Sequence, residues 1–178
     1  VDGKPIYHPT KQLTGLYSGS RLFDIFFSQH LIINGCTLLI PREAFKHFGG
    51  FSSFKYIQDT ECWIKFMLGD MNFFFIKDKL VKMRVHAGQV TQRMPELFYT
   101  EMRQFSNDII DNYLINGKLS HSNIKAFLIY HYKKHNKDIY TKIEKCVGNI
   151  MPIKKYMYQL YGYGFSILGY IYSKTIKR

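Results

Sequence analysis

The chain has 178 residues, of which 46% are hydrophobic, and its 15 Phe, 14 Tyr and one Trp supply enough apolar surface to exclude intrinsic disorder. Its 25 Lys and Arg residues against 13 Asp and Glu leave a net charge of +12, which favours anionic partners: nucleic acid, anionic lipid head groups or phosphorylated substrates. The apolar runs are shorter than the roughly 18 residues that span a bilayer, and the sequence shows no secretory leader. The three cysteines are far apart in the sequence, which indicates a reducing compartment. We therefore expect a cytoplasmic protein.

Residues 1–30 show little periodicity, and small residues predict a loop before the apolar patch at residues 22–27. Residues 34–40, NGCTLLI, predict a buried strand because the run is short and rich in Thr, Leu and Ile. Pro41 suits the first position of a short helix over residues 41–48, since its missing N–H costs nothing there, and Gly49 and Gly50 end that helix.

The next helix is predicted to begin at Asp59. Behind it, four apolar residues follow the i, i+1, i+4, i+5 spacing of one helix face, namely Cys62, Trp63, Phe66 and Met67. Gly69 closes the helix, and residues 72–76 and 79–86 predict two strands.

The pattern changes after Pro95, where a helical stripe runs towards Gly117. Its members are Leu97, Phe98, Met102, Phe105, Ile109, Ile110, Tyr113 and Leu114. Ser120 or Ser122 caps a second helix that buries Ile124, Phe127, Leu128 and His131 on one face. A third stretch covers residues 138–147, and Pro152 opens a last long helix. We therefore predict a mixed α/β fold, with a sheet-and-helix part over residues 1–93 and an all-helical part over residues 94–178.

Three segments stand in order in the first part. The first comprises residues 34–42, Phe45 and the G-G-F of residues 49–51. The second comprises Gln58 and Asp59 together with Trp63. The third is the R-x-H of Arg84 and His86, which is followed by Gln89 and Thr91. Together they resemble the C-terminal, acceptor-side half of the catalytic domain of family 2 glycosyltransferases, which are inverting enzymes with the GT-A fold. The resemblance covers about residues 1–93.

The resemblance implies transfer of a sugar from a nucleotide-sugar donor to a hydroxyl of a glycan or lipid-linked saccharide, with inversion. Inversion is a single displacement, so a base must take the proton of the attacking hydroxyl. The resemblance gives that role to Asp59, with Gln58 beside it. The alternative is that Asp59 is only the N-cap of its helix.

The resemblance also implies that His86 joins the ligands of a divalent cation, Mn or Mg, and that Arg84 contacts the donor phosphate. The alternative is a pair of polar residues at a strand end. The cleft for sugar and acceptor is then lined by Gln58 and by Asn34, Gly35, Cys36 and Thr37, of which the last four otherwise belong to a plain buried strand. Trp63 either stacks on a sugar or is a core residue.

The chain lacks the D-x-D metal motif that the family carries in its nucleotide-binding half. We therefore expect a C-terminal fragment that does not retain the cation alone, because His86 by itself would hold it poorly. The strands of such a fragment have an open edge, so we expect it to self-associate or to need its N-terminal half.

The last predicted helix combines tyrosines with lysines at its ends, which suits a helix lying on an anionic membrane surface. The protein would then be peripheral on the inner face of the membrane; the alternative is a helix packed on the catalytic part. A rival function is a non-enzymatic basic helical module that binds anionic membrane or nucleic acid. Nucleic acid is disfavoured because the aromatic residues lie in apolar stripes.

Overall fold

The structure is a computed structural model, and it describes residues 13–29, 31–78, 80–81 and 95–150. The chain divides into two compact units, Val1–Arg93 and Met94–Arg178. Helices and a small sheet make up the described residues of the first unit, and helices make up those of the second. The predicted mixed α/β fold with a helical region is confirmed.

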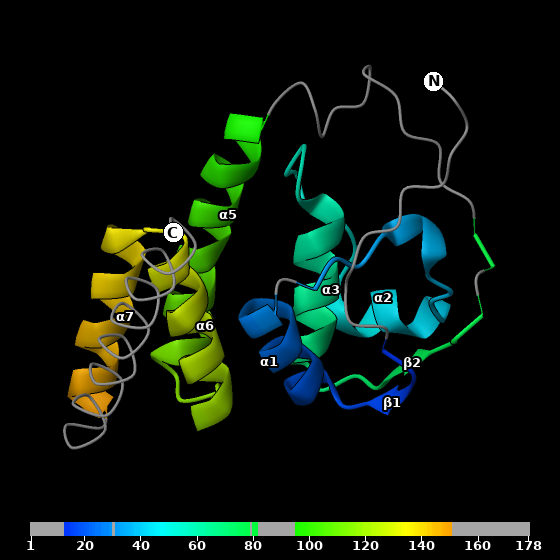
Figure 1. Cartoon of the computed structure of the whole chain (residues 1–178), viewed down its shortest axis with the longest axis horizontal. Coiled ribbons are helices and arrows are strands. Elements are labelled where there is room, and N and C mark those ends of the chain that lie inside the picture. Colours follow the sequence, from blue (N-terminus) through cyan, green and yellow to red (C-terminus); the bar gives the residue numbers. More distant parts are fainter. Residues whose placement is uncertain (1–12, 30, 79, 82–94, 151–178) are drawn as a thin grey trace, which may run out of the picture. The chain divides into compact units, whose positions relative to one another are not determined.

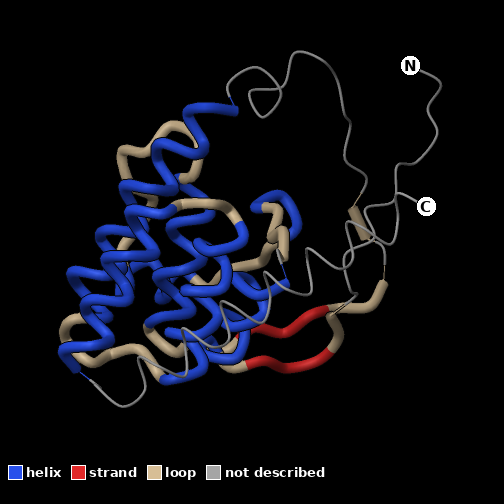
Figure 2. Tube along the Cα trace, turned by 60° about the vertical axis from the view of Figure 1, so that its left-hand side comes forward, coloured by secondary structure: helices blue, strands red, loops and turns tan. Residues whose placement is uncertain are grey.

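The first unit places helices beside a two-stranded sheet (Figure 1). In chain order the elements are β1 (Gly15–Tyr17), α1 (Gly19–Gln29), the 3-10 helix η1 (Gly35–Thr37), α2 (Arg42–Phe48), α3 (Gln58–Leu68) and β2 (Phe73–Phe75). The strands pair antiparallel, with Leu16 opposite Phe74, and form the short red ribbon of Figure 2. The sheet thus joins the segment before α1 to the segment after α3.

The core of this unit lies where α1 packs against α3. The buried residues of the two helices include Leu22, Phe23 and Phe27 from α1 and Cys62, Trp63, Phe66 and Met67 from α3. Full burial of one large apolar side chain contributes about 1.5–3 kcal/mol. The contact between these helices therefore contributes substantially to the stability of the first unit.

Gly19 allows the start of α1 to approach the end of α3. A Cβ atom at this position would collide with the carbonyl oxygen of Met67 and would lie 3.0 Å from Cα of Asp70. The neighbouring Ser20 N–H donates to Oδ1 of Asp70 at 3.4 Å. Because backbone atoms cannot move aside as a flexible side chain can, glycine is needed here.

Three sequence predictions for this unit are confirmed. The helix that carries Asp59 is α3, and Gly69 is its C-cap. The strand predicted over residues 72–76 is β2. The short helix is α2, which begins one residue later than predicted because Pro41 is its N-cap, and Gly49 follows it with a φ of 85°.

The buried strand predicted over residues 34–40 is wrong. Residues 35–37 form η1, residues 38–40 have no regular structure, and Leu39 is fully exposed. Local hydrogen bonds explain the difference: Oδ1 of Asn34 accepts the N–H of Cys36 at 3.0 Å, and the Asn34 carbonyl accepts the hydroxyl of Thr37 at 2.7 Å. Such side-chain bonds replace the ladder bonds that a strand would make.

The loop predicted before residue 22 is wrong as well, since β1 and most of the first turn of α1 lie there. The apolar patch of residues 22–27 is the buried face of α1. Of the strand predicted over residues 79–86, residues 80 and 81 have no regular structure, and residues 79 and 82–86 lie outside the described residues. The helix predicted after Pro152 also lies outside them.

The second unit is helical over its described residues (Figure 1). Its elements are α5 (Pro95–Ile109), the π-helical segment η2 (Ile110–Leu114), α6 (His121–Lys133) and α7 (Lys137–Ile150). Helix α7 packs against α5, η2 and α6. The buried residues include Met102, Phe105, Ile109, Ile110, Leu114, Ile124, Phe127, Leu128, Ile139, Ile143 and Val147.

The helix predictions that fall on the described residues of this unit are confirmed. The stripe that begins after Pro95 forms α5 and continues through η2 to a turn in which Gly117 has a φ of 66°. Ser120 is the N-cap of α6, and its hydroxyl accepts the N–H of Asn123 at 3.2 Å. The third stretch is α7. Within the described part of the chain, no helix is both long enough and apolar enough to cross a membrane.

Candidate active site

Asp59 is the second residue of α3 and is partly exposed. Its Oδ1 accepts the N–H of Thr60 at 2.7 Å and lies 3.4 Å from the Thr60 hydroxyl. Among the described residues, Oδ2 has no hydrogen-bond partner. One carboxylate oxygen is therefore fixed by the helix terminus, and the other remains available.

The N-cap of α3 is Ile57, which makes no side-chain capping bond. The alternative in which Asp59 is the N-cap residue is therefore wrong. Asp59 nevertheless lies in the first turn, where the backbone N–H groups have no partner within the helix and favour a negative charge. Gln58, the first residue of the helix, is exposed beside it.

Gly35 lies against Asp59 and Trp63. A Cβ atom on Gly35 would lie 3.6 Å from Oδ2 of Asp59 and 3.5 Å from Cζ2 of Trp63. Because glycine has no side chain, nothing from position 35 covers the free carboxylate oxygen. The structure thus brings η1 to the start of α3, through a 3-10 turn and not through the predicted strand.

The side chains of the other residues predicted to line the cleft differ in whether a hydrogen bond around η1 already engages them. The Asn34 side chain caps η1, so its Oδ1 is already engaged. Cys36 is exposed, and its sulfur is a free thiol. Thr37 is exposed, but its hydroxyl donates to the Asn34 carbonyl.

Trp63 is a core residue and does not stack on a sugar, because the indole is only 2% exposed. Its ring contacts Phe51 and Phe66, each with a centroid distance of 5.9 Å. Among the described residues its Nε1 has no hydrogen-bond partner, although a buried indole N–H usually has one. Trp63 therefore supports the floor of the site below Gly35.

Cys62 and Glu61 lie next to Trp63 on α3 and are buried. Burial raises the pKa of the Cys62 thiol to about 11, Lys65 lowers it, and Glu61 and Asp59 raise it further. The thiol is therefore protonated at neutral pH and is no nucleophile. Oε1 of Glu61 pairs with Nζ of Lys65 at 2.6 Å, and Oε2 has no partner among the described residues.

Arg84 and His86 lie outside the described residues, so their predicted position across a cleft from Asp59 remains a prediction. The part of the chain that the structure describes contains no cluster of three or more His, Cys, Asp or Glu residues that would hold a metal ion. These residues do not make a site for the divalent cation that the resemblance implies.

Two features of the site escaped the sequence analysis. The first is the hydrogen bond from the N–H of Thr60 to Oδ1 of Asp59. A Thr directly after an Asp in the first turn of a helix is a sequence pattern that could have predicted this bond. The close contact of Gly35 with Asp59 had no local signal, because it depends on how the chain returns from η1 to α3.

Comparison with known proteins adds an independent finding. Over 77 residues the chain is 43% identical to an uncharacterized glycosyltransferase of Rickettsia typhi and 40% identical to an uncharacterized glycosyltransferase of Rickettsia prowazekii. Each match covers 42% of this chain and 24% of the relative, so the chain spans about a quarter of the length of the curated relatives it matches. No protein-family model and no solved structure matches it. Over part of its length, the chain is similar to proteins named as glycosyltransferases.

Proposed function

We propose that this chain is the acceptor-side part of a glycosyltransferase, which moves a sugar from a nucleotide-sugar donor to a hydroxyl of a glycan or lipid-linked saccharide with inversion. The observation that carries the proposal is Oδ2 of Asp59, which lies beside Gly35 and has no hydrogen-bond partner among the described residues. The similarity to the two rickettsial proteins supports the class of reaction. Donor, acceptor and inversion rest on the family resemblance.

The chemistry assigns one role to each oxygen of Asp59. Oδ1 is held by the Thr60 N–H, so the carboxylate keeps its orientation. Oδ2 accepts the proton of the acceptor hydroxyl as the hydroxyl oxygen forms its bond to the anomeric carbon. The bond from that carbon to the donor phosphate breaks, and its electron pair leaves with the nucleoside diphosphate.

Gly35 and Trp63 act on the position of the acceptor and not on the proton. The absent side chain at position 35 leaves room for a hydroxyl next to Oδ2, and the packed indole prevents α3 from shifting. A group held within hydrogen-bond reach of its base reacts without a further search for orientation. We propose that Cys36 and Thr37 form the exposed rim of this space.

The proposal extends to residues outside the described part of the chain. We propose that His86 supplies one ligand to a divalent cation, Mn or Mg, and that Arg84 contacts the donor phosphate. The remaining ligands and the donor-binding half would come from a segment other than the one described here. The cation would neutralise the charge of the leaving diphosphate.

The test is the release of nucleoside diphosphate from a panel of nucleotide sugars in the presence of mixed saccharide acceptors. It is run with the 178-residue chain and with the chain extended by the coding sequence upstream of Val1. We expect Asp59→Asn to reduce turnover at least about a hundredfold, which is the lower end of the usual contribution of a general base. The Asn side chain still accepts the Thr60 N–H, so circular dichroism should show an unchanged fold.

Asp70→Asn is the matched control, since it removes one carboxylate from the same unit at a position whose φ of 56° also suits Asn. It should leave turnover unchanged. Equal turnover in wild type and Asp59→Asn, in whichever form is active, would refute the role of Asp59. Absence of turnover in both forms with every donor would refute the glycosyltransferase proposal itself.

A further inference from the structure

An open hollow of about 690 Å³ lies on the second unit, and all of its lining residues belong to that unit. Its walls are formed by one residue of α5, one of the turn after α6 and one face of α7. The lining residues are Arg103, His135, Lys137, Asp138, Thr141, Lys142 and Lys145. Positions 137, 141 and 145 are four residues apart, so their side chains follow each other along one face of α7.

The charges that line the hollow are mainly positive. Arg103, Lys137, Lys142 and Lys145 face a single lining carboxylate, that of Asp138. Arg103 and Asp138 form an ion pair of 3.4 Å in which both side chains are more than half exposed, and such pairs hold their partners weakly. Among the described residues, Lys137 and Lys145 have no acidic partner.

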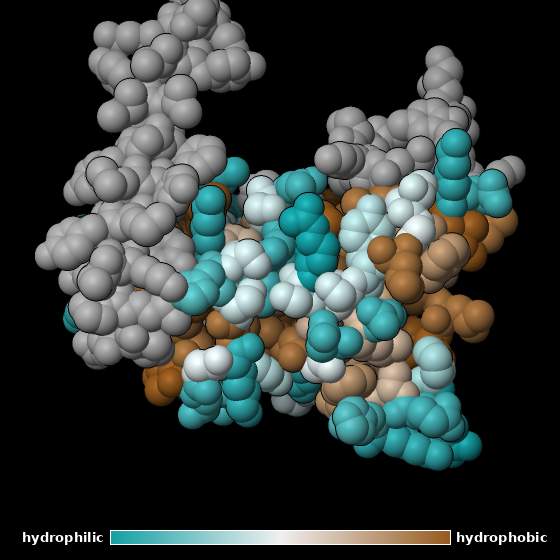
Figure 3. Space-filling view, turned by 90° about the horizontal axis from the view of Figure 1, so that it is seen from below, coloured by the Kyte–Doolittle hydropathy of each residue, from teal (hydrophilic) through white to brown (hydrophobic). Residues whose placement is uncertain are grey.

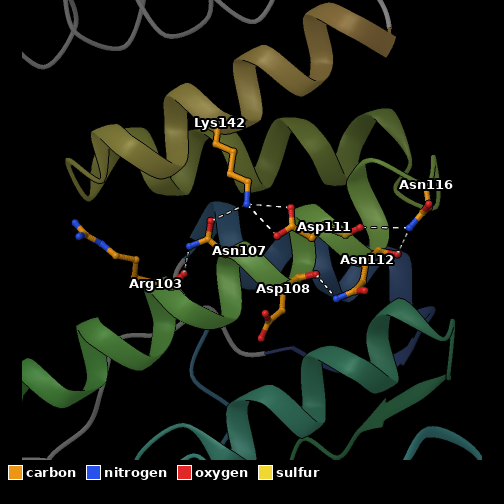
Figure 4. Close-up of polar contacts among 7 residues, drawn as sticks. All are labelled: Arg103, Asn107, Asp108, Asp111, Asn112, Asn116 and Lys142. Carbon is orange, nitrogen blue, oxygen red and sulfur yellow. Dashed lines mark hydrogen bonds and ion pairs between the residues drawn. The ribbon is translucent and has the colours of Figure 1, made fainter.

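Lys142 has a different role, because its ammonium group is held in place from the wall. Nζ donates to Oδ1 of Asn107 at 3.0 Å and to Oδ2 of Asp111 at 3.0 Å, and it lies 2.9 Å from Oδ1 of Asp111 (Figure 4). Nδ2 of Asn107 in turn donates to the carbonyl of Arg103 at 3.1 Å. Asp111 belongs to η2, whose wider turn follows α5 directly.

These contacts connect α7 to α5 and η2 along the wall of the hollow, whereas Lys137 and Lys145 have no acidic partner among the described residues and Arg103 has only its exposed pair with Asp138. Lys137 and Lys145 are separated by eight residues, or about 12 Å along the helix axis, with the Thr141 hydroxyl between them. Their long side chains can converge on one group at the middle of the hollow. Arg103 adds a planar fork of N–H donors from α5, which suits a tetrahedral oxyanion.

We propose that this hollow binds a phosphate group, carried by a soluble phosphate ester or by the head group of an anionic lipid. Arg103, Lys137 and Lys145 contact the phosphate oxygens, Thr141 donates a neutral hydrogen bond, and Lys142 keeps the wall in shape. Phosphate is favoured over a carboxylate because three separate cations and a hydroxyl offer more donors than one carboxylate accepts. The proposal does not depend on the function proposed for Asp59.

The experiment uses the full chain in phosphate-free buffer at low ionic strength. Inorganic pyrophosphate is the soluble probe, and its binding is measured by calorimetry and by amide chemical shifts of labelled protein. Phosphatidylcholine vesicles with and without phosphatidic acid are the membrane probe, and binding is measured by flotation. The variant is Lys137→Glu with Lys145→Glu, and the control is Lys118→Glu with Lys134→Glu, which changes the net charge equally at exposed positions outside the hollow.

We expect the hollow variant to weaken binding of at least one probe about tenfold or more, and the control to weaken it less than threefold. Shifts induced by pyrophosphate should lie within residues 103–111 and 135–145. If the hollow variant loses pyrophosphate binding, the ligand is a soluble phosphate ester. If it loses only the binding of phosphatidic acid vesicles, the ligand is a lipid head group. Either result supports the proposal. Equal binding by variant and control would overturn it, and so would binding of single-stranded DNA with neither probe bound.

The variant can be unstable, because it adds two negative charges near Asp138. The single variant Lys145→Gln, which removes one charge from an exposed position of α7, keeps the proposal testable in that case. It should weaken the same probe about threefold or more while its melting temperature stays that of the wild type. The proposal would again be contradicted if Lys145→Gln folds and binds the probe as the wild type does, and if the double variant also folds and still binds it.

Discussion

The two units of the chain differ in how completely they cover their own apolar residues. Among the described residues, the exposed large hydrophobic side chains of the first unit are Leu16, Ile32, Leu39, Phe51, Phe74, Ile76, Leu80 and Val81, whereas those of the second are Tyr99 and Ile115. Figure 3, which views the side on which β1 and β2 lie in Figure 1, shows hydrophobic residues at the surface. Over the described residues, the second unit exposes few large hydrophobic side chains, and the first has apolar surface that another surface can bury.

The difference extends to the polar groups. The first unit keeps a carboxylate oxygen uncovered at Asp59, and two buried polar atoms of α3, Oε2 of Glu61 and Nε1 of Trp63, lack partners among the described residues. In the second unit, the side chains of Asn107 and Asn112 donate to carbonyls of the preceding helical turn, and those of Asn107 and Asp111 bind Lys142 (Figure 4). The second unit also has one buried polar atom without a partner among the described residues, Nε2 of His131, so the two units differ mainly in the bonded polar network on α5 and η2.

The largest expected effect comes from breaking the contact that holds the first unit together. Gly19→Ala puts a methyl group onto the backbone at Met67, so α1 must move away from α3. Overpacking of this kind costs about 3 kcal/mol, the upper part of the usual range. Denaturant unfolding followed by fluorescence of Trp63, the single tryptophan, should show this loss.

Gly50→Ala is the matched control, because a Cβ there meets no atom within 4 Å. It should change the free energy of unfolding by no more than about 0.5 kcal/mol. The helical signal of the second unit should persist at denaturant concentrations that unfold Gly19→Ala. A single transition, shifted equally for fluorescence and helicity, would show that the two units unfold as one.

The second unit can be weakened selectively by acid through His131. This histidine is 1% exposed, its Nδ1 lies 3.1 Å from Nδ2 of Asn136, and it packs against Phe127 and Tyr130. Burial lowers the pKa of His131 to about 3, against a smaller opposing effect of Asp138. In the unfolded chain the pKa returns to about 6.5, so the unfolded state takes up a proton first as the pH falls.

The folded state of the second unit should therefore lose stability between about pH 6.5 and pH 3. The loss amounts to about 2 kcal/mol by pH 5, and the contribution is fully present above pH 6.5. Thermal melts of His131→Phe should be flatter over this range than melts of the wild type. His135→Asn, at an exposed turn with a φ of 56°, should keep the wild-type pH dependence; equal slopes for all three proteins would contradict the assignment.

Substitutions on the exposed face of the two-stranded sheet should have a smaller effect, and the property they change is self-association of the chain. Leu16 and Phe74 are cross-strand partners and are 68% and 71% exposed. We expect this face to bury itself against a second copy of the chain. Leu16→Lys with Phe74→Lys should weaken self-association about tenfold in sedimentation velocity, because two apolar side chains become charged.

Ile115→Lys with Tyr99→Lys is the control, since it places the same charges on exposed apolar positions of the second unit. It should leave the association constant within about twofold. A wild-type chain that stays monomeric at tens of micromolar would contradict the prediction for the first unit directly.

The sequence predicts the second unit better than the first, and the physical reason is periodicity. In α5 and α6 the stripes from Met102 to Leu114 and from Ile124 to His131 are buried as expected, because local spacing decides which side of a helix faces the core. The capping role of Ser120 follows from local chemistry in the same way. His131 lies on the predicted face, but the turn that buries it depends on Asn136.

In the first unit, contacts distant in sequence decide the outcome. Residues 34–40 have the composition of a strand, yet the side chain of Asn34 closes a 3-10 turn. The paired strands β1 and β2 are three residues long and more than fifty residues apart, too short for any alternation to show. Asp59 was placed correctly at the start of α3, whereas the approach of Gly35 to it needed the folded chain.

The smallest expected change in stability is also the sharpest test of the candidate site. Gly35→Ala places its methyl group 3.5 Å from Cζ2 of Trp63 and 3.6 Å from Oδ2 of Asp59, which are ordinary contact distances. The free energy of unfolding should therefore change by no more than about 0.5 kcal/mol. Under the proposed function, the methyl group would narrow the space beside Oδ2 that an acceptor hydroxyl needs. If the carboxylate oxygen is the base, turnover should fall about tenfold or more with an unchanged fold, whereas Gly50→Ala should keep full turnover. A Gly35→Ala protein with wild-type stability and wild-type turnover would place the acceptor elsewhere and would reduce the first unit to a supporting role.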